Sequence, residues 1–117
     1  MGGDYYFSKV NDRWSETAVG TNAGVTITRT APTGVHFDSV TGFQCSGDAA
    51  ALVSLESPSG TVLWRKRFTA AFTFSEAFPL GAIKGAEAAA VLLKISASTT
   101  NCEANIQGFT IYRSPKA

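Results

Sequence analysis

Charged side chains are scarce in this chain of 117 residues. Asp, Glu, Lys and Arg make up 16% of it, below the roughly 25% that is typical of soluble domains. The formal net charge is only +1, so no global field would recruit nucleic acid or a membrane. A chain so poor in charge either hides surface against a partner or exposes Ser and Thr in place of Lys and Glu, and the composition fits both.

Long apolar runs and targeting signals are also absent. No apolar run approaches the roughly 18 residues that a membrane span needs. Residues 1–6 are polar and aromatic, with neither the basic start nor the apolar stretch of a secretion signal. We therefore expect synthesis in the cytoplasm.

The residues that carry catalysis are few and scattered. His36 is the only histidine, and its neighbours Val35 and Phe37 place it on the strand face opposite the apolar phase, where a catalytic triad would not use it. The acids form no Asp-x-Asp cluster for calcium, and the chain has no phosphate-binding glycine loop and no nucleophile elbow. We predict a protein that is not an enzyme and that needs no cofactor and no metal.

Two cysteines, Cys45 and Cys102, are present without the close spacing of a zinc site. If the strand ending at Cys45 pairs antiparallel with the one starting after Cys102, both cysteines lie at the same end of the fold. A disulfide is geometrically possible if their Cα atoms come within about 7 Å. Cytoplasmic synthesis favours thiols, whereas an extracellular location allows later oxidation, so the sequence leaves both states open.

Hydrophobic residues alternate with polar ones from Val25 onward, which is typical of strands. The clearest hairpin pairs residues 51–57 with 61–68 across Pro58-Ser59-Gly60. In the last strand the apolar phase changes at Gly108, where we expect a β-bulge. The other expected strands cover residues 25–30, 35–45, 70–78, 89–97 and 104–112. Seven to eight short strands with Gly, Pro, Ser and Asn turns predict an all-β, single-domain antiparallel β-sandwich or jelly-roll.

The first residues show no period of two or 3.6. They carry Tyr5, Tyr6, Phe7 and Trp14 among polar side chains. We predict an N-terminal aromatic arm over residues 1–23 that binds a partner, followed by the sandwich domain at 24–117. The alternative is that this segment folds over its own sandwich and caps the core.

The densest basic run is Arg65-Lys66-Arg67. On a strand, Arg65 and Arg67 share one face, whereas Lys66 faces with Trp64 and Phe68. The arginine pair could meet an acidic patch on a partner or a phosphate, or it could be an ordinary charged outer face. The phase of the aromatic residues in this region assigns them to the core rather than to an exposed sugar-binding strip.

The remaining signal is a resemblance. The segments that carry it are Val40-Thr41-Gly42-Phe43, Gly47-Asp48-Ala49-Ala50-Ala51 with Leu52-Val53-Ser54-Leu55-Glu56-Ser57, Gly60-Thr61-Val62-Leu63-Trp64, Phe78-Pro79-Leu80, Leu93-Lys94-Ile95-Ser96-Ala97-Ser98 and Ala104-Asn105-Ile106-Gln107-Gly108-Phe109. With them, residues 34–112 resemble small bacteriophage structural proteins, which are jelly-rolls that trimerise and sit on phage heads or tails. No counterpart precedes Gly24, and no residue-level site is implied.

The resemblance implies a head decoration or cement protein. Such a chain would form a homotrimer, bind the major capsid protein of a phage, reside in the virion, and use neither nucleic acid nor a membrane as partner. The aromatic arm would order on binding, so deletion of residues 1–20 is expected to spare the fold and abolish binding. The alternatives are a tail or baseplate accessory protein and a carbohydrate- or receptor-binding jelly-roll. The candidate partner-binding residues are Tyr5, Tyr6, Phe7, Trp14, Arg65 and Arg67.

Overall fold

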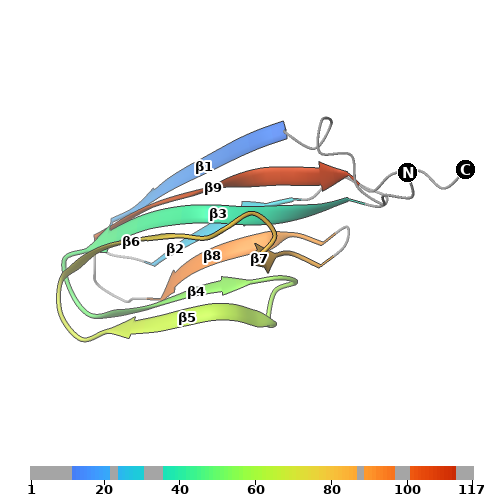
Figure 1. Cartoon of the computed structure of the whole chain (residues 1–117). Helices are drawn as coiled ribbons and strands as arrows, with labels where there is room; N and C mark the ends of the chain where they lie inside the picture. The colour runs from blue at the N-terminus through green and yellow to red at the C-terminus, as the bar shows by residue number, and fades with distance from the viewer. Residues whose placement is uncertain (1–11, 22–23, 31–35, 87–88, 97–100, 113–117) are drawn as a thin grey trace, which may run out of the picture.

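Two antiparallel sheets pack face to face in the computed structural model, which describes residues 12–21, 24–30, 36–86, 89–96 and 101–112 (Figure 1). The strands are β1 (Asp12–Gly20), β2 (Val25–Arg29), β3 (His36–Gly47), β4 (Ala51–Glu56), β5 (Val62–Phe68), β6 (Phe72–Ala77), β7 (Ile83–Lys84), β8 (Val91–Ser96) and β9 (Cys102–Tyr112).

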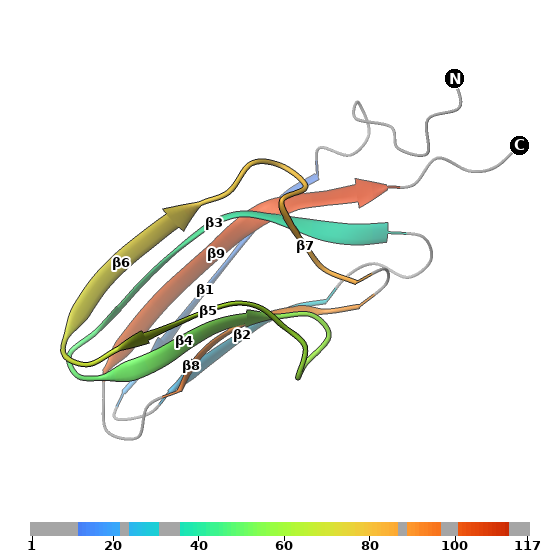
Figure 2. The same ribbon diagram turned by 60° about the horizontal axis from the view of Figure 1, so that its bottom comes forward.

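The strand order is that of a jelly-roll. One sheet has the order β1-β9-β3-β6, with the short β7 paired to β3, and the other has the order β2-β8-β4-β5. Apart from the β4–β5 hairpin and β7, each strand is followed by a strand of the opposite sheet, as in two interlocked Greek keys. Figure 2 shows β5 and β6 at the same edge of the sandwich. The predicted all-β sandwich of the jelly-roll type is confirmed.

Alternation along the strands produces the core. In β2, Val25 and Ile27 are buried whereas Thr26 and Thr28 are exposed. The side chains that fill the space between the sheets come from β3, β4, β8 and β9, and each fully buried one stabilises the fold by about 1.5–3 kcal/mol relative to exposure. The largest apolar members are Phe43, Leu55, Leu93, Ile95, Ile106, Val40, Val53 and Val91.

The predicted hairpin is confirmed, but the predicted bulge is displaced. β4 and β5 pair from Ala51↔Phe68 onward. The register shift lies in β3 rather than in β9, because Val40 pairs with Gly108 and Gly42 with Gln107, which leaves Thr41 as the extra residue. Gly108 has another role. A Cβ added there would overlap the Ser39 carbonyl oxygen and lie 2.7 Å from the ring of Trp14.

The predicted arm is corrected over residues 12–20. These residues form β1, which pairs with β9 along its whole length, from Asp12↔Thr110 to Gly20↔Cys102. The boundary at residues 23 and 24 is therefore wrong, because β1 is an edge strand of the sandwich. Deletion of residues 1–20 would remove this strand, so it is no longer expected to spare the fold. Tyr5, Tyr6 and Phe7 lie outside the described residues.

Candidate functional site

The described residues contain no group of three His, Cys, Asp or Glu side chains that could hold a metal ion. The described residues form strands and turns, and none of them forms a helix long and apolar enough to cross a bilayer. The features of interest are three surfaces and one buried polar cluster. The prediction of a protein without catalytic activity stays a prediction.

The first surface lies on the outer side of the β2-β8-β4-β5 sheet, and we call it the basic face. Arg65 and Arg67 on β5 are both exposed, opposite Ser54 and Leu52 of β4. Their side chains therefore point outward, as predicted. Neither arginine forms an ion pair within the described part of the chain.

A third cation of this face, Lys94, already forms an ion pair within the chain. Its Nζ lies 2.9 Å from Oε1 of Glu56 and 3.2 Å from Oγ of Ser59. Glu56 also accepts a hydrogen bond from the Gly60 amide at 2.8 Å. The Gly60 amide first, and then Lys94, hold the pKa of Glu56 below its usual value. Glu56, an acid on the same face, is thus occupied, and the two guanidinium groups face outward with no ion pair to any of the described residues.

The second surface is the edge where β5 and β6 meet, which we call the aromatic edge. It consists of five partly buried aromatic residues. They are Trp64 and Phe68 from β5, Phe72 and Phe74 from β6, and Phe78, which directly follows β6. The ring centroids of Phe68 and Phe72 are 4.3 Å apart, and those of Trp64 and Phe74 are 5.8 Å apart. The rings pack against the core as predicted, but each keeps part of its surface exposed.

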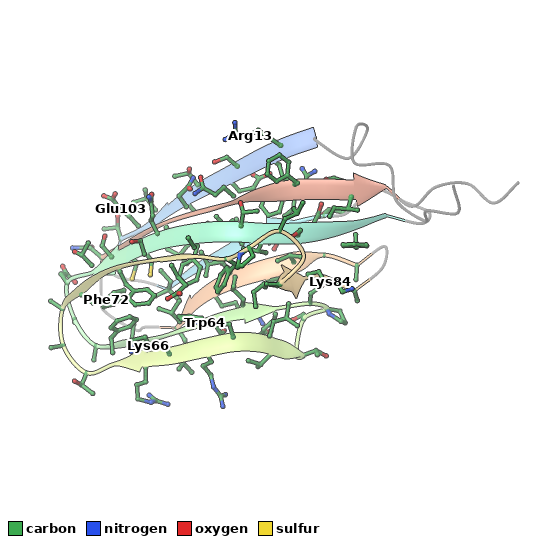
Figure 3. The ribbon with its side chains drawn as sticks, in the orientation of Figure 1. Arg13, Trp64, Lys66, Phe72, Lys84 and Glu103 are labelled. Atoms are coloured by element: carbon green, nitrogen blue, oxygen red, sulfur yellow. The ribbon has the colours of Figure 1, made fainter. Side chains whose placement is uncertain are left out.

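Lys66 belongs to the aromatic edge and not to the basic face. Its Nζ lies 5.6 Å from the centroid of the Phe68 ring and 5.8 Å from that of Phe74. Figure 3 labels Lys66 and Trp64 on β5 and Phe72 at the start of β6. The position agrees with the predicted phase, and a cation over aromatic rings at an exposed site contributes about 0.5–1 kcal/mol.

The third surface is a shallow groove on the outer side of the β1-β9-β3-β6 sheet. Its volume is about 420 Å³. Asn105 is held in place here, because its Nδ2 donates to the hydroxyl oxygens of Ser15 at 3.0 Å and Thr17 at 2.9 Å. Most lining side chains carry a hydroxyl or an amide: Thr17, Gln44, Ser46, Thr73, Ser75 and Asn105. The others are the carboxylate of Glu103 and the side chains of Cys45, Phe74 and Ala104.

A buried polar cluster joins the two sheets. Arg29 of β2 donates from Nη2 to the hydroxyl of Thr110 at 3.0 Å, and that hydroxyl donates to Oδ1 of Asp38 at 2.7 Å. Nε of Arg29 lies 3.5 Å from the other carboxylate oxygen of Asp38. Burial raises the pKa of Asp38, and the Thr110 bond and Arg29 oppose the shift. The cluster of Arg29, Thr110 and Asp38 was not predicted from the sequence.

Trp14 belongs to the same cluster, which corrects its assignment as a partner-binding residue. The guanidinium carbon of Arg29 lies 5.2 Å from the centroid of the Trp14 ring. Only 7% of Trp14 is exposed, so the ring cannot anchor a partner while β1 stays in the sheet. The alternative interpretation, that this segment covers its own core, holds for Trp14.

The cysteines lie at the same end of the sandwich, as the sequence argument expected. Cys45 pairs with Ala104 and Gly47 with Cys102, which makes the cysteines diagonal neighbours on β3 and β9. They are not joined by a disulfide, and both are buried thiols. Burial, and then the neighbouring Cys102, raise the pKa of Cys45 to about 11, and burial also raises the pKa of Cys102.

These thiols are expected to react very slowly in the native protein. At pH 8, Cys45 with its pKa of about 11 holds more than about a hundredfold less thiolate than an ordinary cysteine. The raised pKa of Cys102 acts in the same direction, and burial blocks access to both thiols. Titration with a chromogenic disulfide reagent should detect two thiols rapidly in unfolded, unreduced protein and almost none in folded protein. Absence of thiols from the unfolded protein would show that a disulfide exists.

The strand order defines the class of fold: a small jelly-roll β-sandwich. No family model and no curated protein matches the chain. Among solved structures, the Yersinia pseudotuberculosis-derived mitogen is similar over 92% of both chains, with 10% identity and a TM-score of 0.42. That similarity is too low to carry an argument, so the fold assignment stands on the strand order.

Proposed function

We propose that this chain is a structural protein of a phage particle, a decoration or cement protein that stabilises the head by bridging capsid subunits. It acts as a homotrimer, binds the major capsid protein and resides in the virion. The jelly-roll fold supports this proposal, as do the scarcity of charge and the sequence resemblance. The observation that carries the capsid contact is the basic face, where Arg65 and Arg67 are exposed and form no ion pair with the part of the chain that the structure describes.

On the basic face, Arg65 and Arg67 form no ion pair with the described residues. Such a pair of exposed cations can bind an acidic patch on a different protein. Each guanidinium can bind a carboxylate through two parallel hydrogen bonds. Charge of one sign on such a surface speeds the encounter with a partner of opposite sign and fixes its orientation. Since Lys94 is already bound to Glu56, the arginine pair supplies the specific contact. Added contact area between neighbouring capsid subunits then holds the shell against internal pressure.

Replacement of both arginines by glutamine, R65Q/R67Q, should weaken binding to phage particles that lack the protein by about tenfold, at roughly 0.5–1 kcal/mol for each exposed charge. Cosedimentation with purified particles at two salt concentrations measures the effect, and the wild type should lose affinity as salt rises. The matched control is R13Q/K84Q, which removes the same charge from the other sheet and should bind normally.

Two results would contradict the proposal at different levels. Unchanged binding by R65Q/R67Q would exclude the basic face as the capsid contact. Absence of the chain from purified virions, together with no binding of the wild type to particles, would overturn the function. Electron microscopy of decorated particles separates a head protein from a tail or baseplate accessory protein.

The groove supports a second candidate, a carbohydrate- or receptor-binding jelly-roll. Its hydroxyl and amide side chains carry almost no charge, and such groups can exchange hydrogen bonds with a neutral sugar. A glycan array, with Gln44→Ala as the variant that removes one exposed amide from the groove, tests this candidate. Specific glycan binding that Gln44→Ala weakens would favour it over the capsid contact.

A further inference from the structure

We infer that the aromatic edge is the surface through which copies of this chain bind one another. The inference deepens the proposed function, because it assigns the subunit interface of the proposed homotrimer. It concerns the purified protein alone, so its test needs no phage particle.

An exposed apolar side chain lies next to the rings of the aromatic edge. Among the described residues, the large hydrophobic side chains with the greatest exposure are Val19, Val62 and Leu80. Leu80 is 45% exposed and follows Phe78 by two residues, whereas Val62 pairs with Glu56 and points to the outer side of its sheet. Aromatic rings that stay partly exposed at a sheet edge, beside an exposed leucine, mark a surface that binds another protein.

The backbone at this edge is open as well. β5 and β6 are the outermost strands of their sheets, and Figure 2 shows them at the same edge. However, Lys66 and Glu76 stand on the inward side of these two strands. Inward charges on edge strands oppose sheet extension by another strand. The contact is therefore made by side chains, with the rings as its apolar centre.

The charges of the aromatic edge select a second copy of this chain as the occupant. Lys66 on β5 is the cation and Glu76 on β6 is the anion, and neither forms an ion pair within the described residues. A second copy offers the same two charges. Glu76 of one copy can then face Lys66 of the next, and no charge in the interface is left without a partner.

The other two surfaces suit a second copy less well. On the basic face, Arg65 and Arg67 would meet the same two cations of the copy, and like charges brought together cost several kcal/mol. The groove is lined largely by hydroxyl and amide side chains, which offer little apolar area for a subunit interface. The aromatic edge combines apolar area with self-complementary charge, and the basic face remains available for an unlike partner.

The test replaces Leu80, because this exposed residue beside Phe78 does not support the core. Wild-type protein should sediment as an oligomer at micromolar concentration, and Leu80→Lys should dissociate it with at least about a tenfold rise in the dissociation constant. Val19→Lys is the matched control, since Val19 is 67% exposed on β1, far from this edge in the strand order. It should leave the oligomer unchanged.

Charge reversal gives an independent reading. Lys66→Glu and Glu76→Lys should each weaken the oligomer, and the combined swap should restore it, since the pairing is kept with its signs exchanged. A wild type that stays monomeric at all concentrations would overturn the inference, as would an oligomer that only Val19→Lys dissociates. An oligomer that binds no particle would leave the interface intact and overturn only the proposed function.

Discussion

Replacing Arg29 with Met is expected to lower the free energy of unfolding by about 3–5 kcal/mol at pH 7, the usual cost of leaving a buried charge without its partner. Asp38 is fully buried, and Arg29 is the cation beside it, with Nε 3.5 Å from Oδ2. The variant keeps the carboxylate and removes the guanidinium. The hydrogen bond from Thr110 to Asp38, at 2.7 Å, remains in the variant.

The loss should depend on pH in a defined direction. The folded-state pKa of Asp38 is raised above 3.8, and removal of Arg29 raises it further. The folded variant therefore binds a proton more readily than the unfolded chain, and protonation stabilises it. Its deficit should be full above the folded pKa and should shrink as the pH falls through that value toward 3.8. Urea unfolding at pH 7.5 and pH 5 measures this change.

Two controls accompany this prediction. Arg65→Met removes an exposed arginine and should change stability by less than about 0.5 kcal/mol. The double variant R29M/D38L removes both charges and should lose less than R29M alone, since no charge is left buried. A loss below about 1 kcal/mol for R29M, or a loss independent of pH, would contradict the assignment.

Alanine at position 108 is expected to destabilise the fold by about 3 kcal/mol or more, at or above the upper end of the usual cost of overpacking. The added Cβ would overlap the backbone of Ser39 and press on the ring of Trp14. Relief requires β3 to move away from β9, which would strain the Val40–Gly108 pairing beside the Thr41 bulge. In a domain of this size, such a loss lowers the melting temperature by more than about 10 °C.

Gly42 provides the matched control, because it also lies in a strand next to the bulge. A Cβ there would lie 3.1 Å from the Glu76 carbonyl oxygen and 3.3 Å from the Gln107 side-chain amide, which small shifts can relieve. Calorimetry should therefore show a smaller shift for Gly42→Ala than for Gly108→Ala. Equal melting temperatures would mean that the backbone near Gly108 yields easily.

The sequence predicted the parts of the fold where alternation is complete. The alternation in β2 shows which of its faces is buried: Val25 and Ile27 lie on one face, and Thr26 and Thr28 on the other. A strand with one buried face has this pattern, so the sequence alone was enough to predict it. The hairpin at Pro58-Ser59-Gly60 follows from turn chemistry. Such local signals are enough for the class of fold, but not for the number of strands, because β1 and β7 were not predicted.

β1 was missed because its inward side lacks a hydrophobic pattern. Trp14 is the one large apolar residue there, and it is followed in the same phase by Glu16 and Ala18. Only the full-length pairing with β9 makes the segment a strand. A contact between residues about ninety positions apart leaves no trace in local periodicity.

The buried polar cluster was not predicted from the sequence, for a related reason. Arg29 continues the phase of Val25 and Ile27, and Asp38 shares the phase of Val40, so both stand at core positions of their strands. That shared phase was the available signal. Local pattern reasoning treats a charge in a core phase as the end of the pattern, whereas here two such charges meet across the sandwich.

The register of β1 with β9 also determines where cargo could be attached. Because Asp12 pairs with Thr110, the chain enters and leaves the sandwich at the same end, with the two strands about 4.8 Å apart. The 69–71 turn between β5 and β6 lies at the opposite end, where β3 and β8 end (Figure 1). A peptide fused before β1 and one fused after β9 would therefore be displayed from the same end of the sandwich, side by side.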